Sequence, residues 1–356
     1  MTTVLESLNT ALHQAFAADE RVYLLGEDVL DPYGGAFKVT RGLSMAYPSR
    51  VLTTPISEAS LVGIATGMAL RGLRPIVEIM FGDFLTLAAD QIINHAAKFR
   101  WMYNDQVRLP MLIRTPMGGR RGYGPTHSQT LEKFFLGIPG IQVLAPCALS
   151  ASAPDPECPL FPVGSPGDLL LKAILFTEDP VLFVENKLLY LQTVQDEKRL
   201  GEYEVSLHPN LSESIQPSWA PAFSLKLRSA PPPSLTIAAY GYVAELARQA
   251  VRQLAYEQEI FAELVILTQL APCAIQPVLE SLRRTGRLLV VEEGTLTLGW
   301  GAEVLARAAE TLGSDLKACR RVAAQEVPVP SSGPLEKRVL PDVADIFSAA
   351  VQLNRL

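Results

Sequence analysis

The sequence is poor in cysteine and has no long apolar runs. Its 356 residues include only four cysteines, Cys147, Cys158, Cys273 and Cys319, and no two of them form a CxxC pair. This spacing excludes a zinc ribbon or a redox dithiol and predicts reduced thiols. The uninterrupted apolar stretches, such as Leu288 to Val291, have the length of a strand and fall far short of the ~20 residues of a membrane span.

Several common catalytic motifs are also missing. The chain has no GxxxxGK[ST] phosphate loop, no GxGxxG after a strand and no GxSxG elbow. Its histidines and acidic residues show no metal-ligand spacing, so we expect no metal ligands in this chain. The net charge of −6 argues against a nucleic-acid binder, which needs clustered basic residues. The segment from Met1 to Leu12 lacks an apolar core, so we expect no signal peptide and a cytoplasmic protein.

Short apolar runs alternate with segments of helical period, and this alternation indicates an α/β fold with mostly parallel sheets. In the first half we expect helices at 4–18, 57–70, 84–100 and 168–176, and strands at 22–25, 76–79, 111–114 and 181–184. In the second half we expect strands at 235–239, 262–267 and 288–292, and helices at 243–257, 275–285 and 302–312.

Two proline-rich segments interrupt this alternation. Five prolines fall within 147–167, which predicts a surface loop. Residues 192–234 include the triple proline 231–233, and we interpret this segment as an irregular linker. The expected domains are therefore 1–191 and 235–356.

Ligands of open α/β sheets lie beyond the carboxyl ends of the strands. Three segments fall near such ends, and they contribute Glu27, Glu58 and His127. A carboxylate and an imidazole there are candidates for proton transfer. A second interpretation stays open for each: Glu58 as a helix-dipole partner, His127 as a surface hydrogen-bonding residue, and Glu27 as a solvated loop carboxylate.

These segments, in this order, resemble the beta subunit of the thiamine-diphosphate-dependent E1 component of 2-oxo acid dehydrogenase complexes. The resemblance rests on LLGEDV, GGAFKVTRGL, TTPISEASLVGIATGMALRGLRPIVEI, DQIINHAAKFRWM, GPTHSQTLEKFFLGIPGIQVLAP, DPVLFVENKLLY and TGRLLVVEEG, followed by VPVPSSGPLEKRVLPDVADI. It implies a transketolase-like pyrimidine-binding domain followed by a transketolase C-terminal-like domain.

The resemblance also implies roles for individual residues. Glu58 in PISEAS matches the family glutamate that hydrogen-bonds N1′ of the aminopyrimidine and favours its imino tautomer. Phe84 in FGDF matches the aromatic residue that packs on the pyrimidine ring, while a plain core phenylalanine is its other interpretation. Glu27 matches a glutamate near the cofactor. His127 in THSQ matches the histidine that faces the substrate and the lipoyl group.

The family binds thiamine diphosphate with Mg²⁺ through a GDG motif and a following Asn, and this chain has no GDG. The resemblance therefore implies that an alpha subunit supplies the diphosphate and metal ligands in an α2β2 heterotetramer. A lipoyl-bearing E2 and a small 2-oxo acid are the other implied partners, with no nucleic acid and no membrane. The loop at 173–180 is one residue longer than in relatives and its acidic residues are shifted, so the family's potassium site is not transferred.

The expected function is oxidative decarboxylation of a 2-oxo acid with acyl transfer to lipoyl-E2. Two alternatives stay open. One is the beta-like half of a biosynthetic thiamine-diphosphate enzyme that forms C–C bonds, which the longer loops favour. The other is a non-catalytic scaffold subunit, which the joint presence of Glu58, Phe84 and His127 disfavours.

Overall fold

The computed structural model describes residues 2–209 and 219–356. The chain forms two compact units. Unit 1 comprises 1–117 and 134–194, and unit 2 comprises 118–133 and 195–356. The short piece 118–133 thus belongs to unit 2 although the chain on both sides of it belongs to unit 1.

Unit 1 is built on a parallel sheet with the strand order β5-β6-β4-β3-β1-β2. The strands are β1 (Val22–Gly26), β2 (Val51–Thr53), β3 (Arg74–Glu78), β4 (Leu112–Met117), β5 (Gln142–Leu144) and β6 (Val181–Asn186). The runs inside β4 and β6 are buried almost throughout, as expected for strands that helices cover on both faces.

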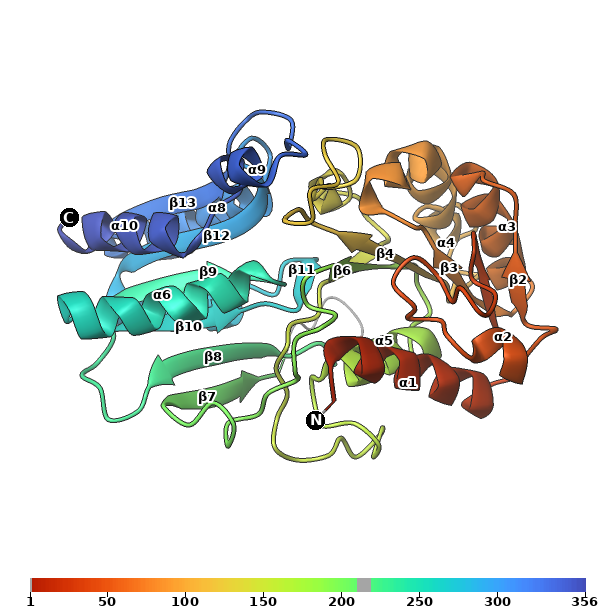
Figure 1. Ribbon diagram of the computed structural model, residues 1–356, viewed down its shortest axis with the longest axis horizontal. Helices are drawn as coiled ribbons and strands as arrows, with labels where there is room; N and C mark the ends of the chain where they lie inside the picture. Colours follow the sequence, from red (N-terminus) through yellow and green to blue (C-terminus); the bar gives the residue numbers. More distant parts are fainter. Residues whose placement is uncertain (1, 210–218) are drawn as a thin grey trace. The chain divides into compact units, whose positions relative to one another are not determined.

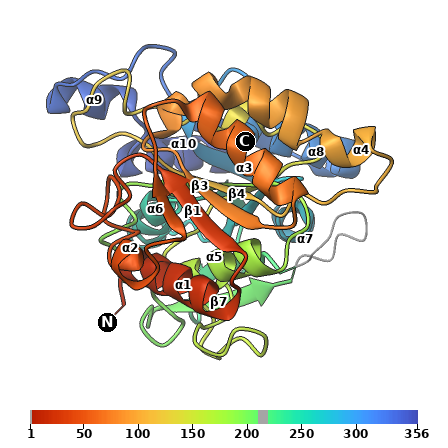
Figure 2. The same ribbon diagram turned by 90° about the vertical axis from the view of Figure 1, so that its right-hand side faces the viewer.

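Helices lie on both faces of this sheet. Figure 2 shows α3 (Glu58–Leu70) on one side of β1, β3 and β4, and α1 (Val4–Ala18), α2 (Leu43–Ala46) and α5 (Pro166–Leu175) on the other. A capping box starts α1: the Thr3 side chain accepts from the Glu6 N–H at 3.2 Å, and the Glu6 carboxylate accepts from the Thr3 N–H at 2.8 Å. The limits of α1 agree with the sequence prediction.

The helix predicted at 84–100 is not a single α-helix. It is a 3₁₀ helix, η1 (Gly82–Ala88), then a π-helical turn, η2 (Gln91–Ala96), then the short α4 (Phe99–Met102). In the wide turn the Asn94 amide donates to the Asp90 carboxylate at 2.8 Å, and the His95 ring lies 3.4 Å from the Asp90 carbonyl oxygen. The prediction of a helical segment is therefore right, but its hydrogen bonds are largely of the 3₁₀ and π types and not those of one α-helix.

The prediction of a surface loop at 147–167 is wrong for much of that segment. Asp155, Cys158 and Phe161 are buried. Lys172 on α5 pairs with Asp155 and lies 3.5 Å from Asp168. Because these opposite charges compensate one another, the segment can fold over α5 despite its polar residues.

Unit 2 has a mixed sheet of order β13-β12-β9-β10-β8-β7, in which the last two strands are antiparallel additions. The strands are β7 (Tyr203–His208), β8 (Ala222–Leu227), β9 (Leu235–Ala239), β10 (Ala262–Ile266), β12 (Arg287–Thr295) and β13 (Ala318–Ala324), and the short β11 (Gln269–Ala271) follows β10 along the chain. Its helices are α6 (Val243–Gln258), α7 (Gln276–Thr285), α8 (Trp300–Leu312), α9 (Gly333–Val339) and α10 (Val343–Asn354), with short 3₁₀ turns η3 (Glu132–Phe134) and η4 (Gly313–Asp315). Helix α6 packs beside α10 in front of the sheet (Figure 1).

The segment 192–234 is not irregular throughout, since β7 and β8 form a hairpin-like pair within it. Its prolines lie around the strands rather than inside them, which is why composition alone concealed the pair. Pro217 lies outside the described residues. The domain limits 1–191 and 235–356 stay a prediction. The two compact units divide the chain at other residues. Across the described residues, no helix is long and apolar enough to cross a membrane.

Candidate functional site

Glu27 and Glu58 lie at one edge of the unit 1 sheet. Strands β1 and β2 run parallel with Gly26 opposite Thr53, so the chain leaves both strands at the same edge. Glu27 follows β1 directly, and Glu58 begins α3 a few residues after β2. The Ser57 N–H, at the start of α3, donates to the Glu27 carboxylate at 3.2 Å. The strand-end rule therefore placed both carboxylates at this edge.

These two carboxylates are largely removed from water, with exposures of 6% for Glu27 and 5% for Glu58. Burial raises the pKa of Glu27, the charge of Glu58 raises it further, and the Ser57 N–H opposes both effects. Among the described residues, no side chain or N–H donates a hydrogen bond to the Glu58 carboxylate. A buried carboxylate at a helix N-terminus without a protein donor is suited to accept an N–H from a ligand.

Phe84 lies beyond the neighbouring strand β3, in the 3₁₀ helix η1. Its half-buried ring meets the edge of Phe81 with centroids 6.0 Å apart. Phe81 in turn packs on Phe37 at 5.9 Å, and the Lys187 ammonium lies 5.1 Å from the Phe81 ring centre. The sequence reasoning missed this aromatic support, because its members come from three separate segments.

A buried ion cluster underlies the same sheet edge. The Arg114 guanidinium on β4 donates to Glu185 at 2.9 and 2.6 Å and also to Glu78. The Tyr190 hydroxyl donates to Glu185 at 2.6 Å. Glu78 and Gly26 are register partners on β3 and β1, so this cluster fixes the strand ends from which Glu27 and Phe84 emerge.

His127 belongs to unit 2, whereas Glu27, Glu58 and Phe84 belong to unit 1. It lies in the glycine-rich loop after β4, half-buried, with Nδ1 3.0 Å from the Thr126 hydroxyl oxygen. The loop is fixed within unit 2 by Glu293, whose carboxylate accepts from the Gly119 N–H at 2.7 Å. Glu293 lies in β12, directly after the apolar run Leu288–Val291 and Glu292, so the strand-end rule applied to that run could have found it too.

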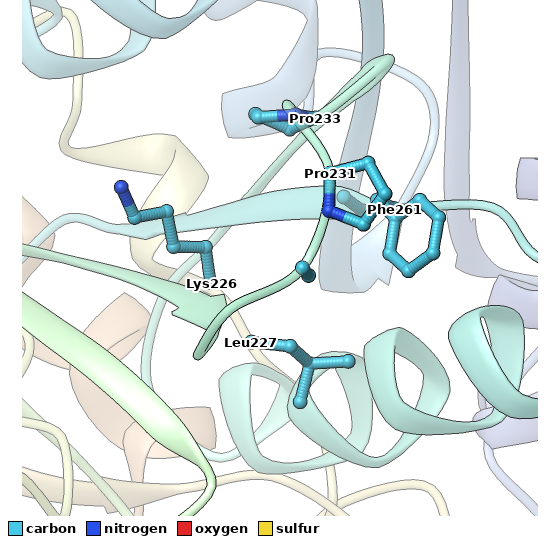
Figure 3. Close-up of a pocket in the computed structure, with 7 residues that line it drawn as sticks. Lys226, Leu227, Pro231, Pro233 and Phe261 are labelled. Carbon is cyan, nitrogen blue, oxygen red and sulfur yellow. The ribbon is translucent and has the colours of Figure 1, made fainter.

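The remaining predictions concern the cysteines and the loop at 173–180. All four cysteines are free, as expected. In the loop at 173–180, to which the family's potassium site is not transferred, the Ile174 and Thr177 carbonyl oxygens accept from the Arg74 guanidinium at 2.9 and 3.0 Å. A small pocket lies by Pro231 and Phe261 (Figure 3), and no site residue lines it.

Two family domains match this chain. Residues 1–151 match the transketolase pyrimidine-binding domain and residues 227–346 the transketolase C-terminal domain. A solved structure titled split gene transketolase, inactive beta4 tetramer, covers 100% of this chain and 99% of its own with a TM-score of 0.71 at 20% identity. This likeness supports the fold.

Curated relatives match along the whole chain. Pyruvate dehydrogenase E1 component subunit beta-2, mitochondrial, of Oryza sativa subsp. japonica is 37% identical over 98% of this chain and 85% of its own length. Acetoin:2,6-dichlorophenolindophenol oxidoreductase subunit beta of Cupriavidus necator is 34% identical over 97% and 95%. The Rickettsia bellii pyruvate dehydrogenase E1 component subunit beta is 34% identical over 98% and 97%. The chain therefore belongs to the transketolase-like family of E1 beta subunits of 2-oxo acid dehydrogenases.

Proposed function

We propose that this chain is the beta half of an E1 enzyme that oxidatively decarboxylates a 2-oxo acid and passes the acyl group to a lipoyl-bearing E2. Family membership supports the reaction class. The observation that carries the residue assignment is the buried Glu58 carboxylate, to which no described residue donates a hydrogen bond. The particular 2-oxo acid is left to the substrate assay below.

The residues at the unit 1 edge fit the aminopyrimidine of thiamine diphosphate. Glu58 would accept the N–H of the pyrimidine N1′ atom and hold that proton. The half-buried ring of Phe84 offers an apolar face for an aromatic ring. When bound, thiamine diphosphate supplies the electron sink that decarboxylation of a 2-oxo acid requires.

Glu27 belongs to the same sheet edge, where its carboxylate accepts the Ser57 N–H at the start of α3. Burial and the charge of Glu58 raise the pKa of Glu27, so Glu27 holds a proton more readily than a free glutamate does. His127, on the unit 2 loop, would donate or accept a proton during acyl transfer.

The partners follow from what this chain lacks in sequence. With no GDG motif, we propose that an alpha subunit supplies the diphosphate and Mg²⁺ ligands, in an α2β2 assembly. We keep the cytoplasmic location as a proposal, although several relatives are mitochondrial. Calorimetric titration of the chain alone with thiamine diphosphate and Mg²⁺ should show no high-affinity binding, and tight binding would contradict the shared site.

The main test reconstitutes the chain with its alpha subunit, thiamine diphosphate and Mg²⁺. Decarboxylation of a panel of 2-oxo acids is followed with 2,6-dichlorophenolindophenol as electron acceptor. Glu58→Gln should slow turnover by about 100-fold or more, the size of effect typical for a proton-transfer group. Glu257→Gln removes the same charge at an exposed site and should leave the rate unchanged. An active Glu58→Gln enzyme would refute the assignment, and a cofactor-bound complex without turnover would favour the biosynthetic or scaffold alternatives.

A further inference from the structure

The loop that carries His127 has an unusual backbone. Residues with φ in the left-handed region alternate along it: Gly118 at 93°, Arg120 at 67°, Gly122 at 69° and Gly124 at 76°. Arg120 is the one non-glycine in this series, so its conformation is strained unless the surroundings hold it. Alternation of this kind turns successive backbone N–H groups toward one side and forms an anion-binding nest.

A carboxylate of the same unit fills this nest. Glu336 lies on α9 and is only 3% exposed. Its Oε1 accepts from the Arg120 N–H at 2.7 Å, and its Oε2 accepts from the Gly122 N–H at 3.2 Å. Glu293 accepts from the preceding Gly119 N–H at 2.7 Å. Three neighbouring donors of the loop are thus paired with two buried carboxylates.

The packing leaves the loop little freedom at this end. A Cβ at position 119 would lie 2.4 Å from Leu340 Cδ1 and 3.1 Å from Glu336 Oε1, so Gly119 packs closely against both side chains. The Arg120 guanidinium donates to the Pro341 carbonyl oxygen and lies 5.8 Å from the centre of the Tyr242 ring. Backbone and side chain of the strained residue are therefore both held by unit 2.

The loop is anchored again after His127. The Tyr240 hydroxyl donates to Glu132 at 2.5 Å. The Lys133 ammonium donates to the Thr295 hydroxyl at 2.5 Å and to the Thr297 carbonyl at 2.8 Å. His127 lies between the two anchors, so fixing either end limits the positions that its ring can take.

We propose that Glu336, assisted by Glu293, is a positioning residue for His127: its carboxylate fills the nest at 119–122 and fixes the loop that presents the imidazole. This inference rests on the proposed role of His127 in acyl transfer. Glu336 itself need not touch substrate. Since the nest requires two acceptor oxygens, a glutamine places an NH₂ donor against a backbone N–H and leaves that N–H unpaired.

The first measurement does not depend on activity. Arg121 is exposed on the loop, and trypsin cuts there when the loop opens. Glu336→Gln in the assembled complex should raise the rate of cleavage after 120 or 121 by about tenfold or more. Glu336→Asp, which keeps both acceptors, should restore part of the protection, and the exposed Glu257→Gln should match the wild type. Unchanged cleavage in Glu336→Gln would overturn the proposal.

The second measurement is a double-mutant cycle in the reconstituted enzyme. Two rates are measured, decarboxylation with an artificial acceptor and acylation of a lipoyl domain, for Glu336→Gln, His127→Ala and the pair. Glu336→Gln should slow the step that His127→Ala slows, by about tenfold, and add little in the His127→Ala background. If Glu336→Gln fails to fold, Glu293→Gln can be used instead, because Glu293 accepts from the Gly119 N–H of the same loop. It should slow the same step.

The outcomes separate the two proposals. If His127→Ala slows neither step, the role of His127 is wrong and the positioning inference falls with it. If His127→Ala slows a step but Glu336→Gln does not, or the two effects multiply, the positioning inference alone is overturned. In either of these cases, loss of turnover in Glu58→Gln still supports the unit 1 assignment.

Discussion

Glu292 offers a quantitative test of the electrostatics in unit 2. It is 0% exposed in the second half of β12, and its Oε1 accepts from the Gly301 N–H at 3.2 Å, near the start of α8. Burial raises its pKa to about 7; the Gly301 N–H opposes the rise, and Glu132 adds to it. Arg321 and Lys133 act weakly in the other direction. The carboxyl thus binds its proton more tightly in the folded chain than in the unfolded chain.

The free energy of unfolding should respond to pH accordingly. A rise from 4.5 to about 7 corresponds to about 3 kcal/mol, at ~1.4 kcal/mol for each pH unit. The contribution of Glu292 to the free energy of unfolding is fully present below its pKa in the unfolded chain. It is lost as the pH rises through its pKa in the folded chain. Above about pH 8 the ionised, buried carboxylate destabilises unit 2 by the whole amount.

Glu292→Gln removes this dependence and keeps an acceptor oxygen for the Gly301 N–H. We expect the variant to be more stable than wild type by roughly 2–3 kcal/mol at pH 8 and about equal at pH 5. Urea unfolding can be followed by tryptophan fluorescence, to which Trp300, 0% exposed on the adjoining turn of α8, contributes. Glu257→Gln, exposed on α6, is the control. Stability curves that stay parallel from pH 5 to 8 would refute the reasoning.

Two further predictions concern buried ion pairs in unit 1. Arg114→Leu leaves the buried Glu78 and Glu185 carboxylates uncompensated and should lower the free energy of unfolding by about 3–5 kcal/mol. Because burial already raises the Glu78 pKa, this loss should be smaller at pH 5 than at pH 8 in urea titrations. An equal loss at both pH values would contradict this reasoning. Lys172→Met leaves Asp155 buried without its cation and should lower the free energy of unfolding by about 3 kcal/mol. Proteolysis within 150–165 should become faster. A variant cleaved at the wild-type rate would show that the ion pair does not hold that segment.

The sequence predicted those parts of the fold that local periodicity determines. The limits of α1 and β9 agree with prediction because their apolar residues repeat at one clear period. Strands β7 and β8 were missed because prolines surround them, and the burial of 147–167 was missed because Lys172 compensates its acidic residues from another element. Local composition carries no information about such a partner.

Some features of the candidate site could likewise be predicted from the sequence, and others could not. Glu27 and Glu58 could be placed together because parallel strands end at one edge of a sheet. The contacts that hold the His127 loop could not be predicted, because Glu293 and Glu336 lie 174 and 216 residues from the loop residues that they bind. No helical or strand period extends over such a separation.

Residues 118–133 belong to unit 2, and this affects which fragments of the chain can fold alone and when unit 2 can fold during synthesis. A fragment that starts at residue 195 would lack the donors for Glu293 and Glu336 and the Glu132 partner of Tyr240, and it would leave buried polar groups unpaired. During synthesis the loop emerges long before α9 exists. We therefore expect the nest to form only after the last quarter of the chain is made, so a single C-terminal truncation before α9 disturbs a loop that is encoded in the first half of the sequence.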